Sequence, residues 1–181
     1  MALEFLRAYS SDSPSAGEPF SFDERDLRLA NRGGARISAV EIAAILQRRC
    51  EIERALREIH PDASLTDRSR SIPWLLLGQL FEAFTDIRGV GFSKATKALH
   101  PKRPALIPML DSVVQAYLTA GEPALSGTFG ERATELVRRY KRDLGRNRAA
   151  LRNLRRELAE HGFQVTEVRI LDLLIWSVSS L

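Results

Sequence analysis

The sequence predicts an all-α fold of about seven to nine helices. Apolar residues recur at helical spacing in several segments, and residues that favour helix starts and ends flank those segments. No segment alternates apolar and polar residues in the way that a half-buried strand does. The chain has 181 residues, of which 44% are hydrophobic. This length and composition favour one soluble globular domain, or two small lobes that share a core, and argue against fibrous and disordered classes.

The first 21 residues are predicted to form a flexible arm, and residues 22–181 a single all-α domain. Residues 10–21 are small and polar and include proline and glycine, which is typical of a loop. The first helix is expected between Phe22 and Asn31 and should stop at the following Gly33-Gly34 pair.

A longer helix is expected after Ser38. Ser38 and Glu41 have the spacing of a capping box. In this motif the serine side chain accepts a hydrogen bond from a backbone N–H of the first turn, and the glutamate side chain accepts one from the backbone N–H of the serine. An apolar stripe continues to about Ile59, and Pro61 disfavours a helix at the residue before it. Cys50 lies inside this helix and is expected in the core. As the only cysteine, it excludes an internal disulfide and a Cys-ligated iron–sulfur cluster.

Two helices joined by a glycine-containing turn are expected in residues 74–99. Pro73 suits the first turn of a helix from Trp74 to Phe84, which is apolar on nearly every side and therefore buried. The second, shorter helix would follow Gly91. Its inward positions are Ala95, Ala98 and Leu99.

Arg-rich helices are expected between residues 128 and 160. Thr128 and Glu131 form a second capping box. A basic helix then runs from about Arg148 to Glu160 and ends before Gly162, which favours a helix C-terminus.

The last helix is expected to begin at Thr166 and to lie in a central, buried position. Its apolar positions are Val168, Leu171, Leu174, Ile175 and Val178. Asp172 interrupts this run, and an acid on an apolar helix is costly unless it is paired. Arg169 lies one turn earlier and is the nearest candidate partner, so Asp172 is interpreted as structural.

The net charge of +4 is unevenly distributed. Residues 1–90 contain 12 basic and 14 acidic side chains, whereas residues 91–181 contain 15 basic and 9 acidic ones. Residues 87–110 contain no acid, and the basic residues among them are Arg88, Lys94, Lys97, Lys102 and Arg103. A second basic run covers residues 138–156 and is either a solvated helix face or a surface for an anionic partner.

The turn within this acid-free segment is Gly89-Val90-Gly91. Glycine permits unusual φ values and lets backbone N–H groups approach a ligand without a Cβ in the way. Val90 would pack into the core, and the N–H groups that open the second helix would suit a phosphate. Lys94 and Lys97 lie one turn apart on that helix and would add charge to the same phosphate track. An ordinary helix–helix turn is the alternative explanation of the two glycines.

A proline-containing loop then leads to Asp111, 20 residues after Gly91, in the pattern Pro-x-x-Asp-x-x-Val. With the Gly-Val-Gly hairpin, this pattern resembles the helix-hairpin-helix DNA glycosylase superfamily over roughly residues 74–118. The resemblance implies a DNA-binding protein whose hairpin region contacts the phosphate backbone of double-stranded DNA. The candidate DNA-binding residues are Gly89, Val90, Gly91, Ser93, Lys94, Lys97, Lys102 and Arg103.

The resemblance also implies a monofunctional glycosylase reaction at Asp111. There the carboxylate would stabilise positive charge on the deoxyribose, or activate water, while a flipped-out base leaves. Asp111 before Ser-Val-Val-Gln is also explained as a helix N-cap, and the two roles do not exclude each other. Bifunctional members of the superfamily carry a lysine nucleophile where Ser93 stands here, so no lyase activity is expected.

The alternative is a non-catalytic helical scaffold or protein-interaction module that kept the fold. Residues 102–114 and 169–176 are in addition similar to a bacterial family of unknown function. No cofactor and no metal site are expected, because the three histidines are far apart in sequence. No segment reads as a targeting signal or a membrane span, so a cytoplasmic protein is expected.

Overall fold

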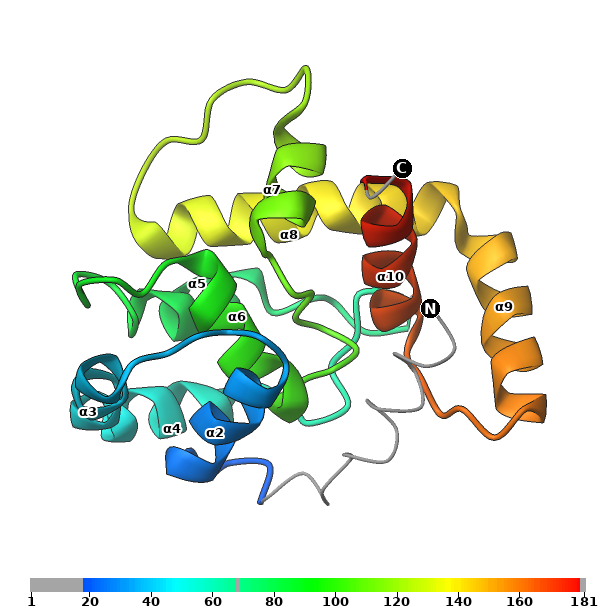
Figure 1. Cartoon of the computed structure of the whole chain (residues 1–181). Helices are drawn as coiled ribbons and strands as arrows, with labels where there is room; N and C mark the ends of the chain where they lie inside the picture. Colours follow the sequence, from blue (N-terminus) through cyan, green and yellow to red (C-terminus); the bar gives the residue numbers. More distant parts are fainter. Residues whose placement is uncertain (1–17, 68, 180–181) are drawn as a thin grey trace.

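The computed structural model describes residues 18–67 and 69–179 (Figure 1). These residues contain nine α-helices, one 3-10 helix and no strand, so the predicted all-α class is confirmed. The elements are α2 Glu24–Arg32, α3 Ala39–Gln47, α4 Arg49–Glu58, α5 Trp74–Glu82, α6 Phe92–Leu99, the 3-10 helix η1 His100–Lys102, α7 Ser112–Thr119, α8 Phe129–Arg146, α9 Arg148–Glu160 and α10 Glu167–Ser179.

Local side-chain caps determine where several of these helices begin. Ser38 and Glu41 form the predicted capping box at α3, and Thr128 and Glu131 form the one at α8. Thr166 accepts a hydrogen bond from an amide in the first turn of α10. These starts agree with the sequence because a cap involves residues only three positions apart.

The single helix expected over residues 38–59 is two helices, α3 and α4. Arg48 has φ −92° and ψ 8°, so it ends α3 and begins α4. The change of direction allows α4 to pack on α5 with Ile52 and Leu56 buried. Cys50 was expected in the core but is exposed. The apolar spacing did not reveal the break because neither proline nor glycine produces it.

Most of the predicted N-terminal arm, residues 1–17, lies outside the described residues. The last part of the arm contacts the domain. The Glu18 and Pro19 carbonyls accept hydrogen bonds from Lys102 and Arg103, at 3.5 and 2.8 Å. This part of the arm is therefore held against the 100–110 segment.

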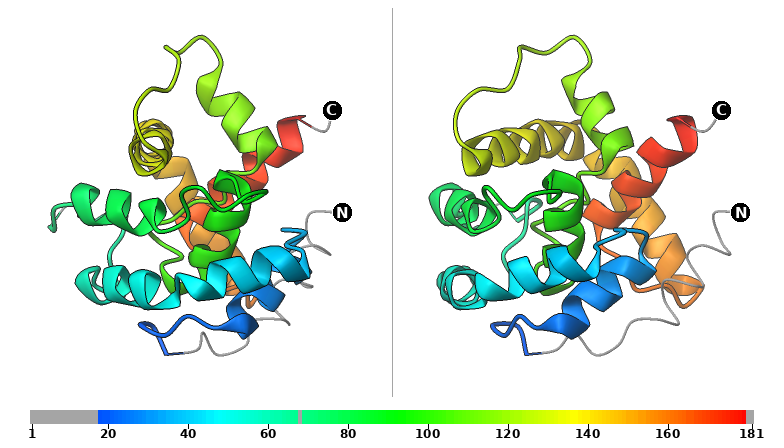
Figure 2. Two further views of the ribbon diagram at one scale, coloured as in Figure 1. Left: turned by 90° about the vertical axis from the view of Figure 1, so that its left-hand side faces the viewer. Right: turned by 60° about the vertical axis from the view of Figure 1, so that its left-hand side comes forward.

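The helices are arranged in three tiers (Figure 1, Figure 2). α7 and α8 form one outer tier, α5 and α6 the middle one, and α2, α3 and α4 the other outer tier. α5 packs on both α8 and α4, and α2 packs on α6. α10 lies beside α7, whereas α9 turns away from the end of α8. None of the helices within the described ranges is long and apolar enough to cross a membrane.

α5 and α8 approach closely where two glycines face each other. A Cβ on Gly130 would overlap the Gly78 carbonyl oxygen. The Gly130 amide donates to Glu82 Oε2 at 2.6 Å, and the Thr128 hydroxyl donates to the same oxygen at 2.8 Å. The end of α5 therefore caps the start of α8, and the two glycines permit this contact.

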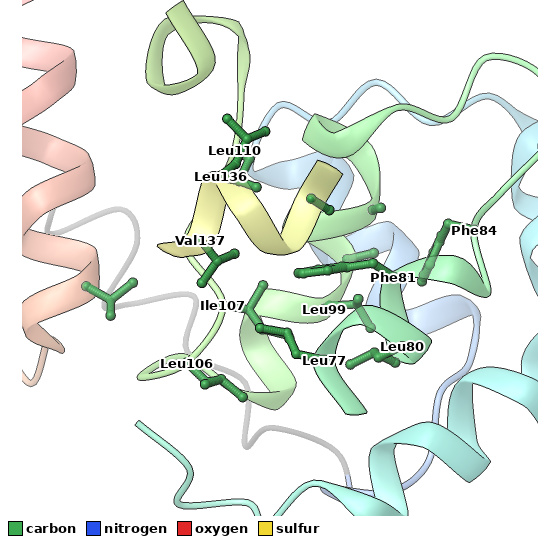
Figure 3. Close-up of a cluster of buried hydrophobic side chains, with 14 of the residues drawn as sticks. Leu77, Leu80, Phe81, Phe84, Leu99, Leu106, Ile107, Leu110, Leu136 and Val137 are labelled. Carbon is green, nitrogen blue, oxygen red and sulfur yellow. The ribbon is translucent and has the colours of Figure 1, made fainter. Parts of the chain in front are cut away.

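A fully buried apolar cluster joins the middle tier to α8 (Figure 3). It combines side chains of α5 and α6 with others from the 103–110 segment and α8. Its labelled members are Leu77, Leu80, Phe81, Phe84, Leu99, Leu106, Ile107, Leu110, Leu136 and Val137. The cluster holds the α5–α6 turn and the segment leading to α7 in one rigid unit, because well-packed cores resist deformation.

α10 is buried along part of its length only. Val168, Leu171 and Ile175 are buried as expected, but Leu174 and Val178 are 41% and 72% exposed. The prediction for these two residues was wrong. Apolar spacing indicates which face of a helix points inward, but it does not show where the packing neighbours end.

Candidate functional site

The predicted glycine turn connects α5 to α6. Gly89 adopts φ +83°, and a Cβ there would collide with the carboxylate of Glu41. Glycine is therefore required at this position both for its conformation and for space. Val90 is 7% exposed and belongs to the core, as expected.

The N-terminus of α6 is open. Gly91 is extended, with φ −101° and ψ −172°, and a Cβ added there would meet nothing within 4 Å. Within residues 18–67 and 69–179, no side chain caps α6. The first N–H groups of a helix have no partner inside the helix. Ser93, in this first turn, is half-buried. An anion that approaches Gly91 would meet free N–H groups at the positive end of the helix dipole.

Lys94 is paired with an acid from another helix. Its Nζ lies 2.6 and 2.8 Å from the two carboxylate oxygens of Glu41. Glu41 also accepts from the Ser38 amide in the α3 capping box. The hydrogen bond from Lys94 lowers the pKa of the Glu41 carboxyl. The capping box is evident from the sequence, whereas this ion pair is not, because Glu41 and Lys94 are distant in sequence and meet only in the folded chain.

Lys97 lies one turn further along α6 and is half-buried. Its Nζ is 3.4 Å from the Gly34 carbonyl oxygen. Burial lowers the pKa of Lys97, and the charge of Asp111 opposes this shift. The Leu110 amide, next to Asp111, donates to the Thr96 hydroxyl of α6 at 3.0 Å, so α6 and the segment that leads to Asp111 lie side by side.

Lys102 and Arg103 have structural roles in place of the expected contact with DNA. They are 4% and 0% exposed. Lys102 Nζ lies 2.8 Å from Asp26 Oδ1 on α2. The Arg103 guanidinium donates to the main-chain carbonyls of Pro19, Leu56, Ile59 and Lys102. It thereby satisfies carbonyls at the end of α4 that have no partner within that helix. A phosphate cannot reach either side chain in this conformation.

Asp111 is the N-cap of α7. Its Oδ1 accepts hydrogen bonds from the amides of Val113 and Val114, at 3.1 and 3.0 Å. Its Oδ2 accepts from Trp176 Nε1 on α10 at 2.7 Å. The residue is 9% exposed. Both oxygens therefore act within the fold, one starting α7 and the other joining α7 to α10.

A second buried acid, Asp172, lies on α10 and is 2% exposed. The Tyr140 hydroxyl lies 2.9 Å from its Oδ1, and the Met109 amide donates to Oδ2 at 3.3 Å. Arg169, the predicted partner, lies 3.9 Å away. Burial raises the pKa of Asp172 to about 7, against the opposing effects of Arg169 and Tyr140. Tyr140 could not be assigned as a partner from the sequence, because it is on α8.

The basic run of residues 138–156 is divided between structural and exposed positions. Arg139 is 5% exposed and donates to the Pro123 carbonyl at 2.8 Å. Arg138 lies over the ring of Trp74, with 5.2 Å between the guanidinium carbon and the ring centroid. The exposed arginines of α9 are Arg152, Arg155 and Arg156. The run is therefore not one continuous solvated face, because Arg139 is buried whereas these arginines of α9 are exposed.

Comparisons with curated proteins and with solved structures give no match. A family model matches residues 8–179, which is nearly the whole chain. The matched family is described as a family of unknown function, DUF6308, and the chain belongs to it.

Proposed function

We propose that this protein binds the phosphate backbone of double-stranded DNA through the start of α6 and the glycine turn before it. The observation that carries the proposal is the uncapped N-terminus of α6, where Gly91 leaves the first N–H groups open. Such groups hold a phosphate through hydrogen bonds and the helix dipole. Arg88 is exposed in the turn and adds positive charge beside it. The contacts go to phosphates, so binding has no sequence preference.

The resemblance to helix-hairpin-helix proteins supports this proposal through the turn itself. Gly89 has a positive φ, and the Val90 side chain is buried in the core. Gly91 has no side chain, so a ligand can approach the first N–H groups of α6. In this proposal the backbone N–H groups make the main contact and the lysines contribute less. Lys94 is neutralised by Glu41, and Lys97 is half-buried.

The proposal is limited to binding and includes no reaction at Asp111. A glycosylase carboxylate must face a base that has been flipped into a pocket. The Asp111 oxygens are hydrogen-bonded to α7 and to Trp176, and the residue is 9% exposed. The geometry therefore supports a cap at this position.

The decisive experiment is DNA binding by a Gly91→Asp variant. An aspartate at an N-cap accepts from the N–H groups of the first turn and so occupies the groups that the phosphate would use. The backbone at Gly91 is extended and has room for a side chain. We expect the variant to be at least as stable as the wild type. We also expect it to bind a 20-base-pair duplex about 10- to 100-fold more weakly at low salt, by fluorescence anisotropy.

A Gln47→Glu variant is the matched control, because it adds the same charge at an exposed position at the far end of α3. It should bind DNA nearly as well as the wild type. For the wild type, the logarithm of the binding constant should fall linearly with the logarithm of salt concentration. For Gly91→Asp the line should be less steep, with the magnitude of its slope lower by about one. Equal affinity of folded Gly91→Asp and wild type would overturn the proposal.

A Glu41→Gln variant tests the same surface in the opposite direction. Glutamine preserves the capping box with Ser38 but removes the negative charge that neutralises Lys94. This variant should bind the duplex more tightly than the wild type at low salt. Weaker binding would show that the Glu41–Lys94 pair is needed to shape the site.

The alternative function is a scaffold that binds a protein partner. The observation in its favour is the exposure of large apolar side chains on α10, where Trp176 is 49% and Val178 72% exposed. Complete absence of duplex binding by the wild-type protein at low salt would favour this alternative.

A further inference from the structure

A groove is lined by α9 and by residues of two loops, and none of its lining residues belongs to the α5–α6 turn. In Figure 1, α9 and the α5–α6 turn lie on opposite sides of α10. Its volume is about 930 Å³, which is within the range of small-molecule sites. One wall is α9, and the other walls come from the segment between α4 and α5 and from the loop between α9 and α10. Segments distant in sequence therefore meet to form it.

The α9 wall is strongly basic. Arg148, Arg152, Arg155 and Arg156 follow one another at helical spacing and line the groove together. Arg155 lies 3.7 Å from Glu167. Arg152 and Arg156 have no ion pair with any carboxylate within residues 18–67 and 69–179. Two guanidinium groups thus face the groove with uncompensated charge, and arginine favours bidentate contacts with phosphate oxygens.

The wall from the segment between α4 and α5 offers hydroxyl groups. The hydroxyls of Ser64 and Thr66 lie 3.0 Å apart, and either can be the donor. Their mutual hydrogen bond uses one of the two hydroxyl protons, so the second can be donated to a ligand. The acid on this wall, Asp67, is engaged by the amide and hydroxyl of Ser69, which lower its pKa.

The groove also has an apolar part. Ala159, Phe163 and Val165 line it, and Phe163 is 9% exposed. A flat uncharged group could lie against these side chains while the phosphates of the same ligand reach Arg152 and Arg156. A site for inorganic phosphate alone would need neither this volume nor an apolar wall.

We propose that this groove is a nucleotide-binding site, in which Arg152 and Arg156 hold the phosphates and the Phe163–Val165 wall holds the base. The site is separate from the start of α6, so it does not depend on the proposed contact with duplex DNA. The nucleotide is either a free one or the terminal nucleotide of a phosphorylated strand. Both present the same phosphate and base to the groove.

The test is isothermal titration calorimetry with ATP, AMP, adenosine and inorganic pyrophosphate. ATP should bind more tightly than pyrophosphate and than adenosine, because only ATP engages both the arginines and the apolar wall. The Arg152→Gln/Arg156→Gln double variant should bind ATP about 10- to 100-fold more weakly than the wild type. Both arginines are exposed, so the variant should keep its stability.

An Arg25→Gln/Arg54→Gln double variant is the matched control, because it removes two exposed arginines from α2 and α4. It should bind ATP like the wild type, and so should Gly91→Asp. Equal binding of ATP and pyrophosphate would overturn the nucleotide assignment. An equal loss of ATP affinity in the two double variants, or no ATP binding at millimolar concentration, would overturn the proposal that this groove is the binding site. Tight binding of a 5′-phosphorylated oligonucleotide that displaces ATP would support the groove and assign the nucleotide to a strand end.

Discussion

At the scale of single residues, Asp111 joins two helices, α7 and α10, that pack against each other. Its Oδ1 starts α7, and its Oδ2 accepts from the Trp176 indole of α10. A substitution therefore affects two contacts at once. The loss of an N-cap costs roughly 1 kcal/mol, and an indole N–H left without its acceptor adds a similar amount.

We expect Asp111→Ala to lower the free energy of unfolding by about 2 kcal/mol. Asp111→Asn should lower it by less, because its amide oxygen can still cap α7. Urea denaturation followed by circular dichroism measures both. Asp62→Ala is the control, since the Asp62 side chain is 86% exposed, and it should change stability by less than about 0.5 kcal/mol. An Asp111→Ala protein as stable as this control would contradict the assigned role.

At the scale of helices, the contact between α5 and α8 depends on one glycine of α8 and not on another. At Gly130 a Cβ would overlap the Gly78 carbonyl oxygen, whereas at Gly145 it would meet nothing within 4 Å. Both residues lie in α8, so helix propensity acts in the same direction at both positions. Packing alone distinguishes them.

Gly130→Ala should therefore destabilise the protein by about 1–3 kcal/mol, because α5 and α8 must separate to admit the methyl group. Gly145→Ala should stabilise it by about 0.5–1 kcal/mol, because alanine is the better helix former and has space. Thermal unfolding of the two variants measures the difference. Stabilisation by both substitutions would show that the helices do not touch at Gly78.

At the scale of the whole molecule, two buried titratable groups give stability opposite dependences on pH. Burial lowers the pKa of His100 to about 4 and raises that of Asp172 to about 7. Between pH 4 and 6.5, the unfolded chain binds a proton at His100 that the folded protein does not, so this group makes stability rise with pH. Between pH 4 and 7, the folded protein binds a proton at Asp172 that the unfolded chain does not. This group therefore makes stability fall as pH rises.

Asp172→Asn should remove the fall in stability with rising pH that is due to Asp172. Relative to the wild type, the variant should gain on the order of 2 kcal/mol in unfolding free energy between pH 5 and pH 8. His100→Asn should behave oppositely and lose relative stability as pH rises from 5 to 8. Urea denaturation at several pH values measures both differences. Parallel pH profiles for the wild type and the Asp172→Asn variant would refute the role of Asp172.

Much of the fold could be predicted from local patterns. The starts of α3, α8 and α10 depend on side chains three residues from the amides they cap, and the sequence shows such spacings directly. The break at Arg48 could not be predicted, because no proline or glycine marks it. The exposure of Val178 depends on where the neighbours of α10 end.

The sequence by itself determined an all-α fold, a glycine turn with Val90 buried, and a basic segment at residues 87–110. It did so because helix periodicity, capping and backbone freedom depend on nearby residues. Only the tertiary structure decided which of those basic groups face solvent. Lys94 meets Glu41, Lys102 meets Asp26, and Arg103 meets carbonyls of α4, all across long stretches of chain. Electrostatic interaction depends on distance in space, so the partner of a charged side chain is decided only when folding brings distant parts of the chain together.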